Sequence, residues 1–299
     1  MREWRWIGAA LAGFAGQVEA QQAAPPPPPA DDAIVVTGER GKGSPEQRFV
    51  AAIAAPSNNG QLARFTDKVC PRSFGLGGEN DEALARRIRK VAAAAHVPVA
   101  DADCRPNLVV LFVQDRRQAI ARWRVDRPDF FAGLAPSRIA ALAGGGDPVA
   151  SWQIVRVMGK DGRPIGKADS DMYDYMVNEQ TVPSRLVSSI QIEFSASFVL
   201  IEQKTIGNAS LTQIADYAAM RTLANTDAKA AAAQRLPTIL SLFSNDGEPV
   251  PLSVTQWDLA YLTALYDSPL AVRASMQKRA MGKQMTRDRD EESAGSDRR

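Results

Sequence analysis

The sequence predicts an α+β domain with a small central sheet, helices from both ends of the domain packed on it, and an all-helical C-terminal part. Residues 108–113 form an unbroken apolar run of strand length, and residues 190–195 alternate between apolar and polar side chains. Helical patterns precede these segments and resume after residue 206. Strands in the middle of a chain with helices on either side are typical of the α+β class. A hydrophobic content of 45% and a charged content of 23% are ordinary for a domain with a real core.

The first twenty residues are expected to be a signal peptide. Arg2 and Arg5 precede an uncharged, Ala/Gly-rich stretch over residues 7–16, and Val18 and Ala20 occupy the −3 and −1 positions of a cleavage site. Such a stretch reaches only about 15 Å as a helix, half of a bilayer core, so it is no transmembrane anchor. No later stretch is apolar and long enough to be a transmembrane segment. We therefore expect export to the periplasm or secretion.

Residues 21–45 are expected to form a Pro-rich disordered tether. Pro25–Pro29 is a polyproline run, which is stiff and extended, and a Gly- and Ser-containing stretch follows before Pro45. A single α+β domain is then expected over residues 46–276. The mixed charges and low apolar content of residues 277–299 predict a disordered charged tail.

The two cysteines, Cys70 and Cys104, are expected to form a disulfide. They are not part of a C-x-x-C pair, and a chain with one histidine has no Cys/His set for a metal. An oxidising compartment favours one bridge, which would add roughly 3 to 4 kcal/mol of stability. Two buried free thiols are the alternative.

The elements of the domain follow from periodicity and capping. A helix is predicted over residues 46–54, and Asn80 can cap a second one over residues 81–95. The 108–113 run predicts a central strand covered on both faces. Short helices are predicted over 118–124 and 137–142, and further strands over 152–158 and within 185–203.

The alternation at residues 190–195 predicts one buried and one solvated face for that last strand. C-terminal helices are predicted over residues 211–224, 228–236, 237–243 and 256–266. Ser210 can cap the first of them, and Thr255 with Asp258 forms a capping box for the last.

Catalytic motifs are scarce. His96 is the only histidine, so a site that needs two imidazoles is excluded. The glycine patterns of phosphate- and dinucleotide-binding loops are absent, and residues 75–78 (Gly-Leu-Gly-Gly) are only a partial match. No cofactor is expected. A net charge of +2 from 36 basic and 34 acidic residues argues against a nucleic-acid partner.

Two sets of residues are candidates for catalysis or binding. His96 follows an Ala-rich helix and precedes Val97 and Pro98, so we expect it to serve the helix terminus and not a Ser-His-Asp triad. Acidic residues cluster in the 169–179 segment, where they could bind a sugar or calcium, although a solvated loop is the plainer interpretation. They are Asp169, Asp171, Asp174 and Glu179.

Residues 31–38 (Asp-Asp-Ala-Ile-Val-Val-Thr-Gly) resemble the TonB box of TonB-dependent outer-membrane receptors. In that family the segment adds as a strand to the protein TonB, a recognition mode that suits an extended β-branched segment on a tether. The resemblance implies a TonB contact through residues 31–40, with Ile34, Val35, Val36 and Thr37 as the partner strand. The remaining mixture of helices and strands departs from the large barrel of those receptors.

Residues 211–220, 237–240 and 257–266 resemble a group of exported alphaproteobacterial proteins of unknown function. This resemblance implies export and nothing about chemistry.

The sequence leaves three hypotheses for the function. The leading one is a periplasmic binding or interaction module without catalysis. The second is a hydrolase of envelope polymers that uses carboxylates or His96 in a cleft beside the 108–113 strand. The third is a TonB-associated accessory protein.

Overall fold

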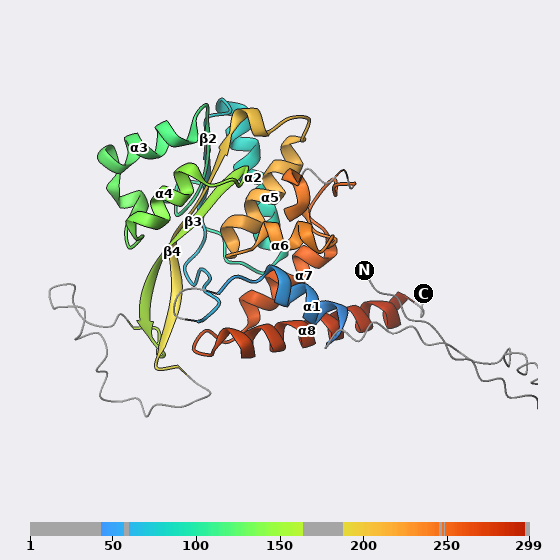
Figure 1. Ribbon diagram of the computed structural model, residues 1–299. Helices are drawn as coiled ribbons and strands as arrows, with labels where there is room; N and C mark the ends of the chain where they lie inside the picture. Colours follow the sequence, from blue (N-terminus) through green and yellow to red (C-terminus); the bar gives the residue numbers. More distant parts are fainter. Residues whose placement is uncertain (1–42, 57–59, 164–187, 245–246, 248, 297–299) are drawn as a thin grey trace, which may run out of the picture. The chain divides into compact units, whose positions relative to one another are not determined.

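The computed structural model describes residues 43–56, 60–163, 188–244, 247 and 249–296 (Figure 1). Within them lies one mixed sheet with the strand order β1-β2-β4-β3. Strands β1, β2 and β4 are parallel, and β3 is antiparallel to β4. The strands are β1 (Pro71–Phe74), β2 (Leu108–Val113), β3 (Val149–Gly159) and β4 (Ile190–Glu202). The expected α+β class is confirmed.

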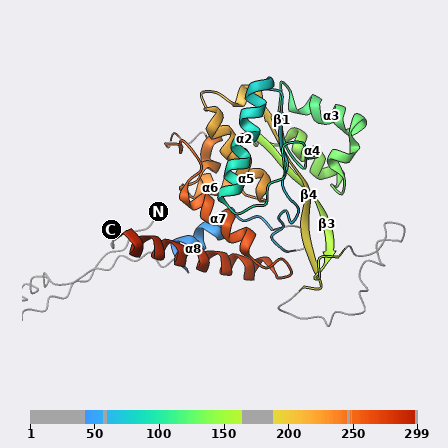
Figure 2. The same cartoon turned by 180° about the vertical axis from the view of Figure 1, so that it is seen from behind.

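Helices cover both faces of this sheet (Figures 1 and 2). One face carries α2 (Gly78–Ala94) and α5 (Leu211–Leu223), and the other carries α3 (Arg116–Asp126), η1 (Pro128–Phe131) and α4 (Pro136–Gly144). The side chains of β2 alternate between the two cores, because Leu108, Val110 and Phe112 face the α2 side while Val109 and Leu111 face the α3 side. The expectation of a central strand covered on both faces is therefore confirmed.

The remaining helices belong to the two ends of the domain. The first is α1 (Pro45–Ile53), which is capped by Ser44. The others are η3 (Gln203–Thr205), α6 (Ala228–Ala233), η4 (Ile239–Phe243), α7 (Gln256–Asp267) and α8 (Ala274–Ser296). The capping box predicted for α7 is present, with Thr255 and Asp258 bonded to each other's backbone N–H groups.

The solvated face predicted for β4 is wrong. Gln191 and Glu193 are 8% and 3% exposed, although they alternate with apolar neighbours. The segment at Arg64 pairs with β4 at Glu193, and the Glu193 carboxylate accepts hydrogen bonds from Thr66 at 2.7 Å and from Arg156 at 3.0 Å. A segment from far back in the sequence therefore covers the face that alternation alone assigns to solvent.

The start of α2 also differs from its prediction, because the helix begins at Gly78 and Asn80 is not its cap. The Asp81 carboxylate points back over the preceding loop, where it accepts the backbone N–H groups of Leu76 and Gly77 and the Ser73 hydroxyl. This single side chain satisfies the backbone N–H groups of the two residues that precede the helix.

The C-terminal end of α2 is a Schellman motif. The backbone N–H of Val97 donates to the Ala92 carbonyl at 2.9 Å, and that of His96 donates to Ala93 at 3.1 Å. His96 occupies the left-handed position of the motif, with φ of 58°, where glycine is the usual residue. The chain then returns to the core through Val97, which is 3% exposed.

The disordered tail predicted for residues 277–299 is wrong over the described residues 277–296, because α8 covers Ala274–Ser296. Met281 and Met285 are placed at helical spacing and are buried, at 0% and 3% exposure, whereas Met276 near the start of the helix is exposed. Buried Gln277 binds the chain at Leu62, whose backbone N–H donates to the Gln277 Oε1 at 2.8 Å. At Gly282 the helix approaches α1 so closely that a Cβ atom would lie 2.9 Å from the Cα of Gln47.

The predicted disulfide between Cys70 and Cys104 is present, with the two Cα atoms 6.0 Å apart. It encloses α2 and joins the start of β1 to the loop before β2. None of the helices in the described ranges is long and apolar enough to cross a bilayer.

Candidate functional site

A groove of about 370 Å³ lies between the C-terminal end of α2, α1, α7 and α8, and we call it the His96 groove. It brings together His96, the only histidine of the sequence, with α7, whose start the capping box predicted, and α8, a segment that the sequence predicts to be disordered. Its lining residues are Ala94 and His96 of the α2 end, Glu46 of α1, Gln256, Trp257, Leu259, Ala260 and Thr263 of α7, and Met285, Asp288 and Arg289 of α8.

His96 lies at the rim of the groove and is exposed. Its backbone, and not its ring, binds the end of α2. The ring has no hydrogen bond or ion pair with any residue in the described ranges, so it is not paired there with the Ser hydroxyl and carboxylate that a triad requires. The predicted position at a helix terminus is confirmed.

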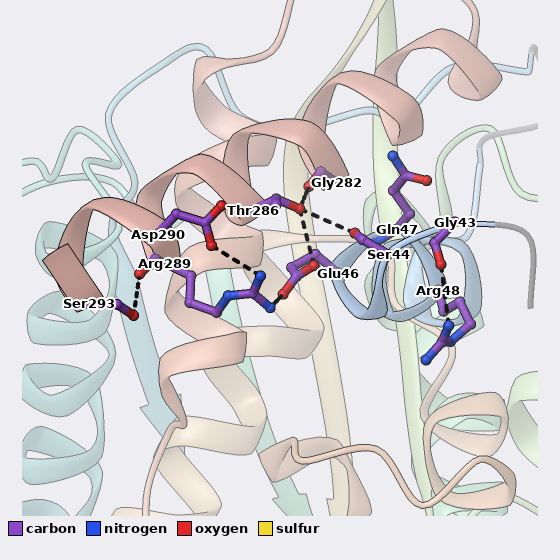
Figure 3. A network of polar contacts seen from close by, with 10 residues as sticks. All are labelled: Gly43, Ser44, Glu46, Gln47, Arg48, Gly282, Thr286, Arg289, Asp290 and Ser293. Atoms are coloured by element: carbon purple, nitrogen blue, oxygen red, sulfur yellow. Dashed lines mark hydrogen bonds and ion pairs between the residues drawn. The ribbon is translucent and has the colours of Figure 1, made fainter. Parts of the chain in front are cut away.

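The buried carboxylate of Glu46 ties α1 to α8 (Figure 3). Glu46 is 2% exposed; Arg289 donates to its Oε1, and the Thr286 Oγ1 lies 3.0 Å from its Oε2. Burial acts to raise the pKa of Glu46, but hydrogen bonds from Ser44, its own backbone N–H and Thr286, together with the charge of Arg289, lower it overall. Glu46 therefore remains a carboxylate that already has its partners, which suits a structural link better than proton transfer.

The other buried carboxylates in the described part of the chain are likewise engaged. Asp216 accepts both Arg87 Nε, at 2.6 Å, and Arg87 Nη2, at 2.8 Å. Asp258 accepts the Thr238 hydroxyl and the backbone N–H of Ile239. Glu193 forms an ion pair with Arg156. Each of these buried acids therefore has a cation or several hydrogen-bond donors beside it. A pair of free carboxylates for acid-base catalysis is not found among them.

A polar hollow of about 300 Å³ lies just beyond the end of β2, close to where the hydrolase hypothesis places its cleft. Asp115 caps α3 by accepting the Gln118 N–H at 2.8 Å, and Glu202 accepts the Arg116 N–H at 3.1 Å. The Arg116 guanidinium donates to the carbonyl oxygens of Gly145 and Asp147 at 2.6 and 2.7 Å. These charged groups hold the α3 and α4 loops together.

Two backbone donors of the Gly75–Gly78 loop are already bound within the chain. The N–H groups of Leu76 and Gly77 face the Asp81 carboxylate, which occupies the place where an anion would bind. Within the described ranges, no group of three or more His, Cys, Asp or Glu side chains is arranged to hold a metal ion.

Two sets of predicted residues lie outside the described residues. They are the TonB-box-like strand, Ile34, Val35, Val36 and Thr37, and the acidic cluster, Asp169, Asp171, Asp174 and Glu179. The α8 wall of the groove was missed, although Gln277, Met281 and Met285 recur at intervals of four, which is the spacing of one helix face. Comparisons with protein-family models, curated proteins and solved structures find no match.

Proposed function

We propose that this protein is an exported, non-catalytic binding module and that the His96 groove is its ligand-binding surface. The basic and apolar N-terminal pattern supports export, and disulfides such as Cys70–Cys104 form and persist in oxidising compartments. The observation that carries the binding hypothesis is the lining of the groove. Apolar side chains form its walls, while its buried carboxylate is already neutralised by Arg289.

The expected ligand has an uncharged, apolar body. The Trp257 indole, which packs against Phe49 with ring centroids 5.2 Å apart, provides a rigid flat wall, and Leu259 and Ala260 continue it along α7. Met285, on α8, faces the same space and can adapt its shape to a bound group. Concave apolar sites with a few polar groups at the rim are the usual form of small-ligand sites.

The binding hypothesis is tested with an uncharged apolar dye, N-phenyl-1-naphthylamine, whose fluorescence rises on leaving water. Ala260→Phe fills the groove from a partly exposed position, so saturable dye binding should fall at least tenfold, and Trp257→Leu should weaken it as well. Val125→Ala, on an 80% exposed side chain of α3, is the matched control and should change nothing. Equal dye binding by wild type and Ala260→Phe would refute the hypothesis that the His96 groove is the binding surface.

The hydrolase alternative has its own experiment. Purified cell-wall sacculi incubated with the protein should release no soluble fragments. Release by the wild type and a loss of about a thousandfold in His96→Gln, the scale of a missing triad member, would overturn the non-catalytic hypothesis.

A further inference from the structure

A second cavity, of about 350 Å³, lies on the other side of α5 from α2, between α5, α6, η4 and the start of β3, and we call it the Tyr217 cavity. Its apolar floor includes Val149, Leu240 and Phe243. It shares no lining residue with the His96 groove, so the binding hypothesis for each site can be tested without the other.

Tyr217 is a buried side chain whose hydroxyl has no hydrogen bond to any other described residue. The residue is 2% exposed, and its ring packs edge-on against Phe243 with centroids 4.8 Å apart. Tyr217 lines the cavity, so a bound molecule could supply the hydrogen-bond partner that tyrosine hydroxyls usually have when they leave water. Burial raises the pKa of Tyr217, an effect that Arg221 opposes and Asp147 reinforces, so the hydroxyl is a donor at neutral pH.

Arg221 lies one turn further along α5 and also lacks an acceptor. Its guanidinium carbon is 6.0 Å from the Tyr217 ring centroid, and its Nε is buried without a hydrogen-bond partner in the described part of the chain. No carboxylate pairs with Arg221 or with Arg138, a third lining residue, within the described ranges. Because Nε itself is buried, the outer Nη groups of Arg221, which lines the cavity, are the donors that an acceptor from outside the chain could meet.

The other charged groups of the cavity are already paired. Lys229 forms an ion pair with Asp147 at 2.8 Å, and Asp227 caps α6 by accepting the Ala230 N–H at 2.9 Å. What remains is an excess of guanidinium charge beside a phenol donor and an apolar floor. Three positive side chains, Arg138, Arg221 and Lys229, line the cavity with two negative ones, Asp147 and Asp227. One net positive charge matches a singly charged, partly apolar ligand better than a phosphate dianion.

We propose that the Tyr217 cavity binds a small organic monocarboxylate. Its carboxylate accepts hydrogen bonds from Arg221 and the Tyr217 hydroxyl, with Arg138 at the rim, and its apolar body lies over Phe243 and Leu240. Arginine suits this role because its planar guanidinium matches the geometry of a carboxylate.

Calorimetric titration of the mature protein tests the proposal with acetate, butyrate, benzoate and 3-phenylpropionate as probes. At least one of the three larger carboxylates should bind more tightly than acetate and than its own neutral amide, and inorganic phosphate should bind more weakly than that carboxylate. Arg221→Gln and the nearly isosteric Tyr217→Phe should each weaken binding about tenfold or more, because a hydrogen bond to a charged group is lost. Arg122→Gln, on an 80% exposed side chain of α3, should have no effect.

Circular dichroism and thermal unfolding establish whether each variant is folded. If Arg221→Gln does not fold, Tyr217→Phe still tests the proposal. No saturable binding of any of the carboxylates, equal binding of acid and amide, stronger binding of phosphate, or unchanged affinity in the folded variants would each overturn the proposal. Dye binding at the His96 groove should be unaffected by these variants, so a failure at one site is not mistaken for a failure at the other.

Discussion

Removal of the Cys70–Cys104 bridge should cost a large share of the stability of the domain. The two cysteines are 34 residues apart in sequence, and closing a loop of that length removes unfolded-state entropy worth about 4 kcal/mol at 25 °C. Domains are typically stable by only about 5–15 kcal/mol. The double substitution Cys70→Ala and Cys104→Ala should therefore lower the free energy of unfolding by roughly a third or more.

Urea denaturation followed by circular dichroism measures this change. Because the bridge acts mainly on the unfolded chain, the dependence of the unfolding free energy on urea should steepen in the variant, as its unfolded state exposes more surface. Wild type whose bridge has been broken by a thiol reductant should show the same change. A loss below about 1 kcal/mol with an unchanged urea dependence would refute the entropic account, and Cys70, at 1% exposure, would then be only a packing residue.

Three further predictions concern helix ends and the α1–α8 contact. His96→Gly should raise the melting temperature by about 2 °C, because glycine relieves the left-handed strain by more than it adds unfolded-state entropy; a lower melting temperature would contradict this. Gly282→Ala should cost about 1 kcal/mol in urea denaturation, since its Cβ would lie 2.7 Å from the Gln47 Cγ, and a gain in stability would show that α8 can move away. Glu46→Gln should cost about 1–2 kcal/mol at pH 7. Because folding lowers the pKa of Glu46, its contribution is fully present above the ordinary glutamate value. The contribution disappears as pH falls through the lower folded value, so the difference between the two proteins should shrink in acid. A constant difference across pH would contradict the assignment.

Much of the fold could be predicted from the sequence. The apolar run of β2 predicted a strand buried on both faces, and the Thr255–Asp258 box marked the start of α7. The cysteine pair, with the expectation of export, predicted its bridge. Each of these signals is either contained within a few neighbouring residues or follows from residue counts and an expected oxidising location, so no knowledge of distant contacts was needed.

The features that define the two candidate sites depended on the tertiary structure. Glu46 and Arg289 are 243 residues apart, and their pairing, together with burial of Met281 and Met285, holds a charged C-terminal segment as a helix that forms one wall of the His96 groove. Glu193 alternates with apolar residues like a solvated side chain, yet Arg156 and the segment at Arg64 bury it. Local patterns specify helices and strands because their hydrogen bonds and faces repeat over a few residues. Whether a polar side chain is exposed, paired or left without a partner in a cavity is decided by segments that meet only when the chain folds.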